Sequence, residues 1–129
     1  MSVKRILVVD DEANVREVVQ ACLRDLGGWE VLEAASGREG LTIAAIEQLD
    51  AIVLDLMMPE MDGLAFLRAL HSNPQTQTIP VVMLTAKTAW IDANGVGQSG
   101  AKGAISKPFN PITLHQEIAE VLGWDIDDE

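Results

Sequence analysis

Cysteine is nearly absent from this sequence, because Cys22 is the only one among 129 residues. A lone cysteine excludes an internal disulfide framework. Cys22 falls on the apolar stripe of a predicted helix, which favours a buried thiol over a redox sensor or metal ligand. The stretch from Met1 to Arg5 contains no apolar signal-peptide region, so a cytoplasmic location is expected.

Positive charge is also scarce, with 9 Lys and Arg residues against 20 Asp and Glu residues and a formal net charge of -11. No basic stripe is available to follow a phosphate backbone, and an anionic membrane surface would repel the chain. No apolar run approaches the roughly 20 residues that span a bilayer. Direct binding to nucleic acid or membrane is therefore not expected.

The chain has enough apolar residues for one core, since 48% of its residues are hydrophobic, and it is too short for a second domain. We expect a domain over residues 1–123. The remaining residues, 124–129, are rich in carboxylates and are expected to form a solvated acidic tail.

Short apolar runs alternate with stretches of helical periodicity. The runs predict five strands, at Lys4–Val9, Trp29–Ala34, Ala51–Leu54, Val81–Leu84 and Gly103–Ser106. Helices are expected between them and after the last one. This alternation favours an α/β fold, a doubly wound flavodoxin-like (βα)5 architecture with a five-stranded parallel sheet in the order 2-1-3-4-5.

The helix boundaries carry their own signals. Ser36 is a suitable N-cap for a second helix, and Pro111 is suited to be the first residue of the last helix. The stretch from Thr88 to Ser99 has a weak helical pattern because it contains Gly95 and Gly97, so a short fourth helix is expected there.

Polar residues follow four of the predicted strands. Asp10 and Asp11 follow the first strand, Asp55 the third, Thr85 the fourth and Lys107 the fifth. Ligands of open parallel sheets bind beyond the carboxyl ends of the strands, so these side chains are expected to share one site.

The chemistry of these groups indicates phosphoryl transfer. Carboxylates in one crevice raise one another's pKa values unless a cation joins them, and Mg²⁺ is the natural hard cation for oxygen ligands. Lys107 offers a positive charge and Thr85 a hydroxyl donor, which suit the oxygens of a phosphoryl group. Asp55 is left as the nucleophile.

Four segments together resemble the CheY-like receiver domain of two-component response regulators. Residues 6–12 resemble the acidic start of that family, 55–63 its phosphoacceptor loop, 84–86 its switch motif and 107–109 its lysine motif. The resemblance covers nearly the whole chain, with the motifs in the family's order.

The resemblance implies that Asp55 accepts a phosphoryl group from a phosphohistidine of a sensor histidine kinase or a histidine phosphotransfer protein. It implies that Asp11, Asp55 and the backbone carbonyl of Met57 bind Mg²⁺, and that Asp10 acts through water. Lys107 would pair with a phosphoryl oxygen, and its bond to Pro108 is expected to be cis. Such a domain is a phosphoacceptor that assists its own phosphorylation and dephosphorylation rather than an enzyme.

The resemblance also implies a switch. Thr85 would move toward the phosphate and change the face made by the fourth predicted helix, the fifth strand and the last helix (helix 4, strand 5 and helix 5). A separate effector protein or a second copy of the chain would bind there. The family usually has an aromatic ring three positions before the lysine, and here Ala104 occupies that position. We therefore expect a smaller surface change, or one that runs through helix 4.

Besides a stand-alone switch or relay protein, the sequence leaves three other functions to consider. A phosphorylation-independent scaffold of the same fold gains support from Ala104. A phosphatase of the haloacid dehalogenase class is disfavoured because Met57 stands where a second Asp is needed. A flavodoxin is disfavoured because the acidic residues after strand 1 would repel an FMN phosphate.

Several other side chains receive structural interpretations. His71 and His115 are expected to be surface imidazoles, because neither has companion ligands nearby in the sequence. Glu12 is expected to be an exposed first-turn residue. Met58 and Met61 could either pack under the phosphoacceptor loop or contact a partner.

The first prediction concerns the lifetime of the phosphorylated form. Met57 and Lys87 stand at the two positions where the family tunes hydrolysis of its acyl phosphate, and neither is a carboxylate or amide that would position water. We predict slow unaided dephosphorylation, measured as decay of the phosphoprotein in Mg²⁺ after the donor is removed. A half-life of only seconds would contradict this prediction.

Overall fold

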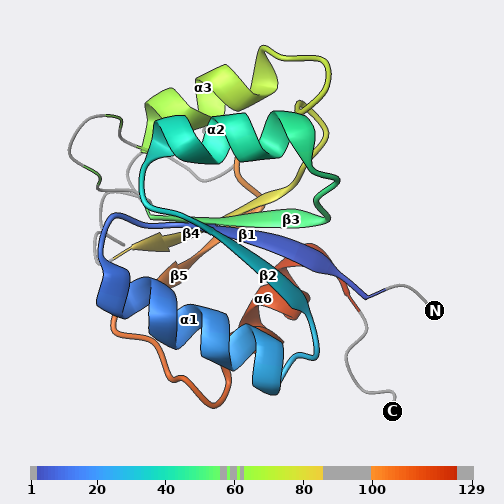
Figure 1. Ribbon diagram of the computed structural model, residues 1–129. Helices are drawn as coiled ribbons and strands as arrows, with labels where there is room; N and C mark the ends of the chain where they lie inside the picture. Colours follow the sequence, from blue (N-terminus) through green and yellow to red (C-terminus); the bar gives the residue numbers. More distant parts are fainter. Residues whose placement is uncertain (1–2, 56–57, 59–60, 62, 86–99, 125–129) are drawn as a thin grey trace.

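The computed structural model describes residues 3–55, 58, 61, 63–85 and 100–124 (Figure 1). The elements in chain order are β1 Arg5–Val9, α1 Ala13–Asp25, β2 Glu30–Ala34, α2 Gly37–Ile46, β3 Ala51–Asp55, α3 Gly63–His71, β4 Val81–Thr85, β5 Gly103–Ser106 and α6 Leu114–Leu122. The expected helix over Thr88–Ser99 and the acidic tail after residue 124 lie outside the described residues.

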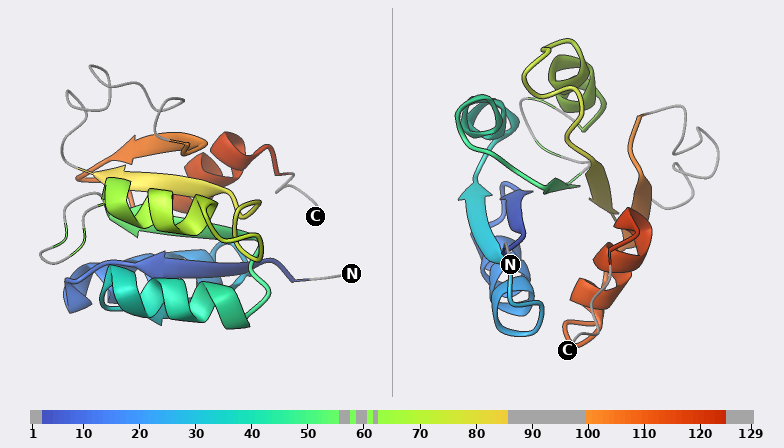
Figure 2. Two further views of the ribbon diagram at one scale, coloured as in Figure 1. Left: turned by 90° about the horizontal axis from the view of Figure 1, so that it is seen from above. Right: turned by 90° about the vertical axis from the view of Figure 1, so that its right-hand side faces the viewer.

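The five strands form one parallel sheet in the order β2-β1-β3-β4-β5. Helices α2 and α3 cover one face and α1 and α6 cover the other, as the two views in Figure 2 show. This arrangement confirms the predicted flavodoxin-like sheet. Within the part of the chain that the structure describes, no helix combines the length and the apolar content needed to cross a bilayer.

The sheet separates two apolar cores, and successive strand residues point to alternate sides. On the side of α2 and α3 the strands contribute Leu7, Val9, Ile52, Leu54, Val81 and Met83. On the side of α1 and α6 they contribute Ile6, Val8, Ala51, Val53, Val82, Leu84 and Ile105. Because both faces are covered, the central strands are continuous apolar runs rather than alternating ones.

The start of α2 is fixed as the sequence predicts. The Ser36 hydroxyl accepts a hydrogen bond from the Glu39 N–H at 3.1 Å, and the Glu39 carboxylate accepts one from the Ala35 N–H at 2.7 Å. The helix then lies close to the sheet at Gly40, where a Cβ atom would come within 2.9 Å of Val9 and 3.1 Å of Phe66. Cap and close packing together place the β2–α2 connection beside the carboxyl end of β1.

The last helix begins later than predicted. Pro111 lies in a turn, and α6 starts at Leu114. The Asn110 carbonyl accepts a hydrogen bond from the Thr113 N–H at 3.1 Å, and the Asn110 side chain accepts one from the Ile112 N–H at 2.9 Å. Pro111 therefore occupies the second position of a turn that Asn110 starts, a position that its fixed φ suits as well as it suits a helix start.

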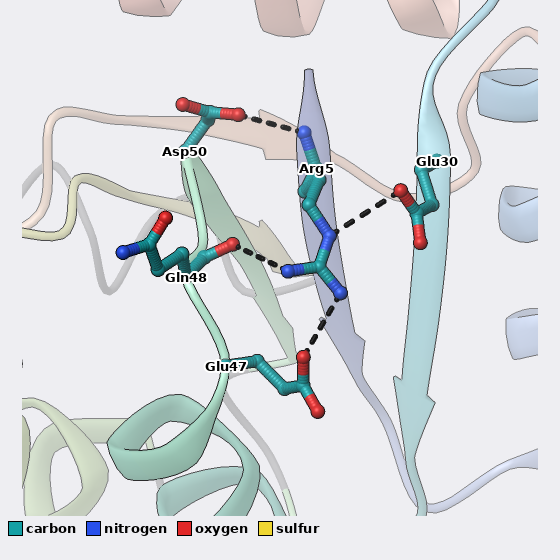
Figure 3. A network of polar contacts seen from close by, with 5 residues as sticks. All are labelled: Arg5, Glu30, Glu47, Gln48 and Asp50. Atoms are coloured by element: carbon teal, nitrogen blue, oxygen red, sulfur yellow. Dashed lines mark hydrogen bonds and ion pairs between the residues drawn. The ribbon is translucent and has the colours of Figure 1, made fainter. Parts of the chain in front are cut away.

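At the amino-terminal ends of the strands, Arg5 connects the beginning of β1 to neighbouring segments (Figure 3). Its guanidinium lies 3.3 Å from the Glu30 carboxylate and 3.0 Å from that of Glu47, and it donates to the Gln48 carbonyl at 3.0 Å. The Arg5 N–H donates to the Asp50 carboxylate at 2.8 Å. The hydrogen bond with Glu47 raises the pKa of Arg5. The network joins β1, β2 and the α2–β3 connection.

The packed core extends to Trp124, the first residue of the expected acidic tail. Its ring meets that of Trp29 edge to face, with 5.3 Å between the ring centroids and 88° between the planes. The Lys4 ammonium lies 4.9 Å from the centroid of Trp124. Trp29 belongs to the core on the side of α1 and α6, and Trp124 packs against that core.

The expected degree of burial is confirmed for Cys22 but not for the two histidines. Cys22 is buried as predicted, and burial raises the pKa of its thiol. His71 and His115 are half-buried rather than surface imidazoles, which corrects the prediction. His71 packs against Gly100, where a Cβ atom would lie 2.5 Å from the ring. His115 Nδ1 is buried and has no hydrogen-bond partner among the described residues.

Candidate metal and phosphoacceptor site

The polar residues that follow the strands meet at one edge of the sheet, as predicted. Asp55 and Thr85 are the last residues of β3 and β4, and Asp10 and Lys107 directly follow β1 and β5. Since all strands are parallel and in register, their carboxyl ends place these side chains at the same edge. Asp55 and Thr85 are almost fully buried, at 6% and 1% exposure.

Lys107 lies between two buried carboxylates. Its Nζ is 3.3 Å from Asp10 Oδ2 and 3.5 Å from Asp55 Oδ1. The exposed fraction of the side chain is 2% for Asp10, 7% for Asp55 and 19% for Lys107. Buried carboxylates are costly unless they are paired, so this one cation balances part of the negative charge at the edge of the sheet.

The acidic residues also form a group that fits a metal ion. One carboxylate oxygen from each of Asp10, Asp11 and Asp55 lies within 4.8 Å of the others, and Asp11 faces solvent. A set of hard oxygen donors with one open side suits Mg²⁺, which keeps several of its waters. Met57, whose carbonyl is the further expected ligand, lies outside the described residues, as does Lys87.

The ends of β4 and β5 are joined next to this group. The Lys107 N–H donates to the Thr85 carbonyl at 2.9 Å, and the Lys107–Pro108 bond is cis, as expected. The backbone of Thr85 is therefore tied to the residue whose amine enters the site. Ala104 pairs with Met83 in the sheet and is half-buried against the core on the α2 and α3 side.

Asp10 is held at all four of its polar atoms. Its N–H donates to the Ala34 carbonyl at 3.1 Å, and its carbonyl accepts a hydrogen bond from Arg16 Nη1 at 2.7 Å. Oδ1 accepts from the Glu12 N–H at 2.9 Å, and Oδ2 faces Lys107. Sequence reasoning missed Arg16, because a bond to a backbone carbonyl leaves no motif. Its only signal is a cation in the first turns of the helix that follows the acidic pair.

A cleft of about 200 Å³ opens beside Asp11, between the start of α2 and the segment after β3. Met58 is buried in the core, and Met61 is half-buried with its sulfur 2.8 Å from the position that a Cβ atom of Gly37 would take. Both methionines therefore pack in the structure, which is one of the two roles expected from the sequence. The cleft is lined by Asp11, Ala35, Ser36, Gly37, Arg38, Met58 and Met61.

Comparison with known proteins agrees with this geometry. The response regulator receiver domain family matches residues 6–119. The response regulator Rre1 of Synechocystis sp. is 38% identical over 117 residues, which cover 91% of this chain and 51% of Rre1. Other relatives are named transcriptional regulators. The chain spans about half the length of the curated relatives it matches.

Solved structures share the fold. The chemotaxis protein CheY4 of Vibrio cholerae is 37% identical with a TM-score of 0.85, covering 93% of this chain and 99% of CheY4. The receiver domain of a sensor histidine kinase from Pseudomonas aeruginosa, which has a magnesium ion coordinated in its active site cleft, is 28% identical with a TM-score of 0.82. That similarity covers 95% of this chain and 99% of the other. The chain therefore belongs to the response regulator receiver domain family.

Proposed function

We propose that this receiver domain accepts a phosphoryl group on Asp55 from a phosphohistidine of a sensor histidine kinase or a histidine phosphotransfer protein, in a reaction that requires Mg²⁺. One observation carries the proposal. The Asp55 carboxylate is buried at the end of β3, 3.5 Å from the Lys107 amine and within the group of three carboxylates. A structural role alone would not require three acids and one lysine at a single edge of the sheet.

The residues divide the work of the transfer. An Asp55 oxygen attacks phosphorus, the bond from phosphorus to the donor imidazole nitrogen breaks, and its electron pair stays on that nitrogen. Lys107 pairs with a phosphoryl oxygen, and the Thr85 hydroxyl donates to another. Asp11, Asp55 and the Met57 carbonyl would hold Mg²⁺, with Asp10 acting through water, and the ion would supply positive charge to the carboxylates and the phosphoryl group.

The output of the domain follows from the same elements. We propose that a separate effector protein, or a second copy of the chain, recognises the face that includes β5 and α6. The net charge of -11 argues against DNA contact by these residues themselves. The relatives that are named transcriptional regulators are about twice as long as the matched segment. Transcriptional regulation is therefore attributed to those whole proteins. A cytoplasmic location remains our prediction.

Phosphorylation of Asp55 is tested by incubation with acetyl phosphate and Mg²⁺, followed by intact mass and peptide mapping. We expect a mass increase of one phosphoryl group, absent without Mg²⁺ and absent in Asp55→Asn. Asp25→Asn, which changes an exposed acid on α1, is the matched control and should be phosphorylated normally.

Two results would contradict the proposal. Wild-type protein that stays unmodified with both acetyl phosphate and a phosphorylated histidine donor would favour the scaffold function that Ala104 suggests. A phosphoryl group that persists in Asp55→Asn would place the acceptor elsewhere.

Metal binding is tested separately through stability. Ligand that binds only the folded protein stabilises it by about 2.7 kcal/mol at 100 times its dissociation constant. We expect Mg²⁺ to raise the free energy of unfolding of the wild type and to have almost no effect on Asp11→Asn. Urea unfolding with and without Mg²⁺ gives both values. Because Asp11 is exposed, this variant should fold, and an equal response to Mg²⁺ in both proteins would remove Asp11 from the metal site.

A further inference from the structure

We infer that Arg16 is a positioning residue for the metal site, acting through the peptide group that joins Asp10 to Asp11. The inference rests on the proposed function, since it concerns the same site. Arg16 lies in the second turn of α1 and belongs to none of the segments that carry the family resemblance.

Arg16 is held between two elements. Its Nη1 donates to the Asp10 carbonyl at 2.7 Å, and its Nε lies 3.4 Å from the Glu33 carboxylate on β2. The Arg16 side chain is 17% exposed and that of Glu33 is 41% exposed. Hydrogen bonds from a charged donor are shorter and stronger than neutral ones, and the ion pair with Glu33 fixes the direction of the guanidinium.

The bond to the Asp10 carbonyl bears directly on Asp11. A peptide group is planar, so fixing the carbonyl of Asp10 also fixes the N–H of Asp11 and the position of the Asp11 Cα in the same plane. The other side of Asp10 is held by its N–H bond to the Ala34 carbonyl. Asp11 is exposed, and this peptide group sets the position of the Cα atom from which its carboxylate extends.

Electrostatics and positioning predict opposite effects when Arg16 is neutralised. A positive charge near the three carboxylates repels Mg²⁺, so its removal alone would strengthen metal binding. Loss of a bond that orients a metal ligand weakens metal binding, typically by 10-fold or more when an outer partner is removed. The sign of the change therefore distinguishes positioning from a simple charge effect.

The test compares Arg16→Met, Arg16→Lys and Arg24→Met. Methionine keeps most of the aliphatic chain and removes every donor, whereas lysine keeps the charge and one donor group. Arg24→Met removes the same charge from an exposed pair farther along α1. Isothermal titration with MgCl2 gives the dissociation constant. Amide NMR of the metal-free proteins reports on the Asp11 N–H, and thermal unfolding reports on stability.

We expect Arg16→Met to weaken Mg²⁺ binding about 10-fold and to shift the Asp11 amide signal before metal is added. Arg16→Lys should recover part of the affinity, and Arg24→Met should bind as the wild type does. Tighter or unchanged Mg²⁺ binding in Arg16→Met would overturn the inference. If Arg16→Met does not fold, wild-type affinity and an unmoved Asp11 signal in Arg16→Lys would overturn it, and a loss of affinity at constant charge would support it.

Failure of this inference is distinct from failure of the proposed function. A wild-type protein that binds no Mg²⁺ would contradict the proposed function itself. If the wild-type protein binds Mg²⁺ and is phosphorylated on Asp55, and Arg16→Met does both equally well, only the role of Arg16 is contradicted.

Discussion

The amine of Lys107 between two buried carboxylates is the interaction on which the site depends. Asp10 and Asp55 are removed from water at the edge of the sheet, and Lys107 Nζ lies 3.3 Å and 3.5 Å from their oxygens. Without a nearby cation, two such carboxylates would repel each other. Lys107 keeps charged oxygens available for a metal and a phosphoryl group, and its partners explain why the amine points into the site.

The remainder of the fold serves to hold these three groups in place. The apolar strands fill both faces of the sheet, so their ends are rigid and in register. The cap at Ser36 and the close approach at Gly40 set α2 beside β1, and the Arg5 network joins the strands at the opposite edge. Asp10 then connects strand, helix and lysine through its own four polar atoms.

Sequence reasoning reached the sheet order and the meeting of Asp10, Asp55 and Lys107, because apolar runs and polar strand ends are both local patterns. The sequence-based prediction was wrong where one local pattern is compatible with two different structures. Pro111 has a fixed φ that suits a helix start and the second position of a turn, and Asn110 decides between them.

Contacts that leave no sequence motif were also beyond the sequence. Arg16 reaches a backbone carbonyl, Trp124 reaches Trp29, and His71 fills the space left by a glycine 29 residues later, Gly100. The Met57 carbonyl and the expected fourth helix, which the sequence assigns to the metal and to the switch, belong to segments outside the described residues and stay predictions.

A double-mutant cycle of Lys107→Met and Asp55→Asn measures whether Lys107 offsets the repulsion between the buried carboxylates. The free energy of unfolding is measured by urea titration in EDTA. In the wild-type background, Asp55→Asn loses an ion pair and relieves repulsion, whereas in the Lys107→Met background it relieves repulsion alone. If Lys107 offsets this repulsion, Asp55→Asn is more stabilising in the second background by about 1–3 kcal/mol. Equal effects in both backgrounds would contradict it.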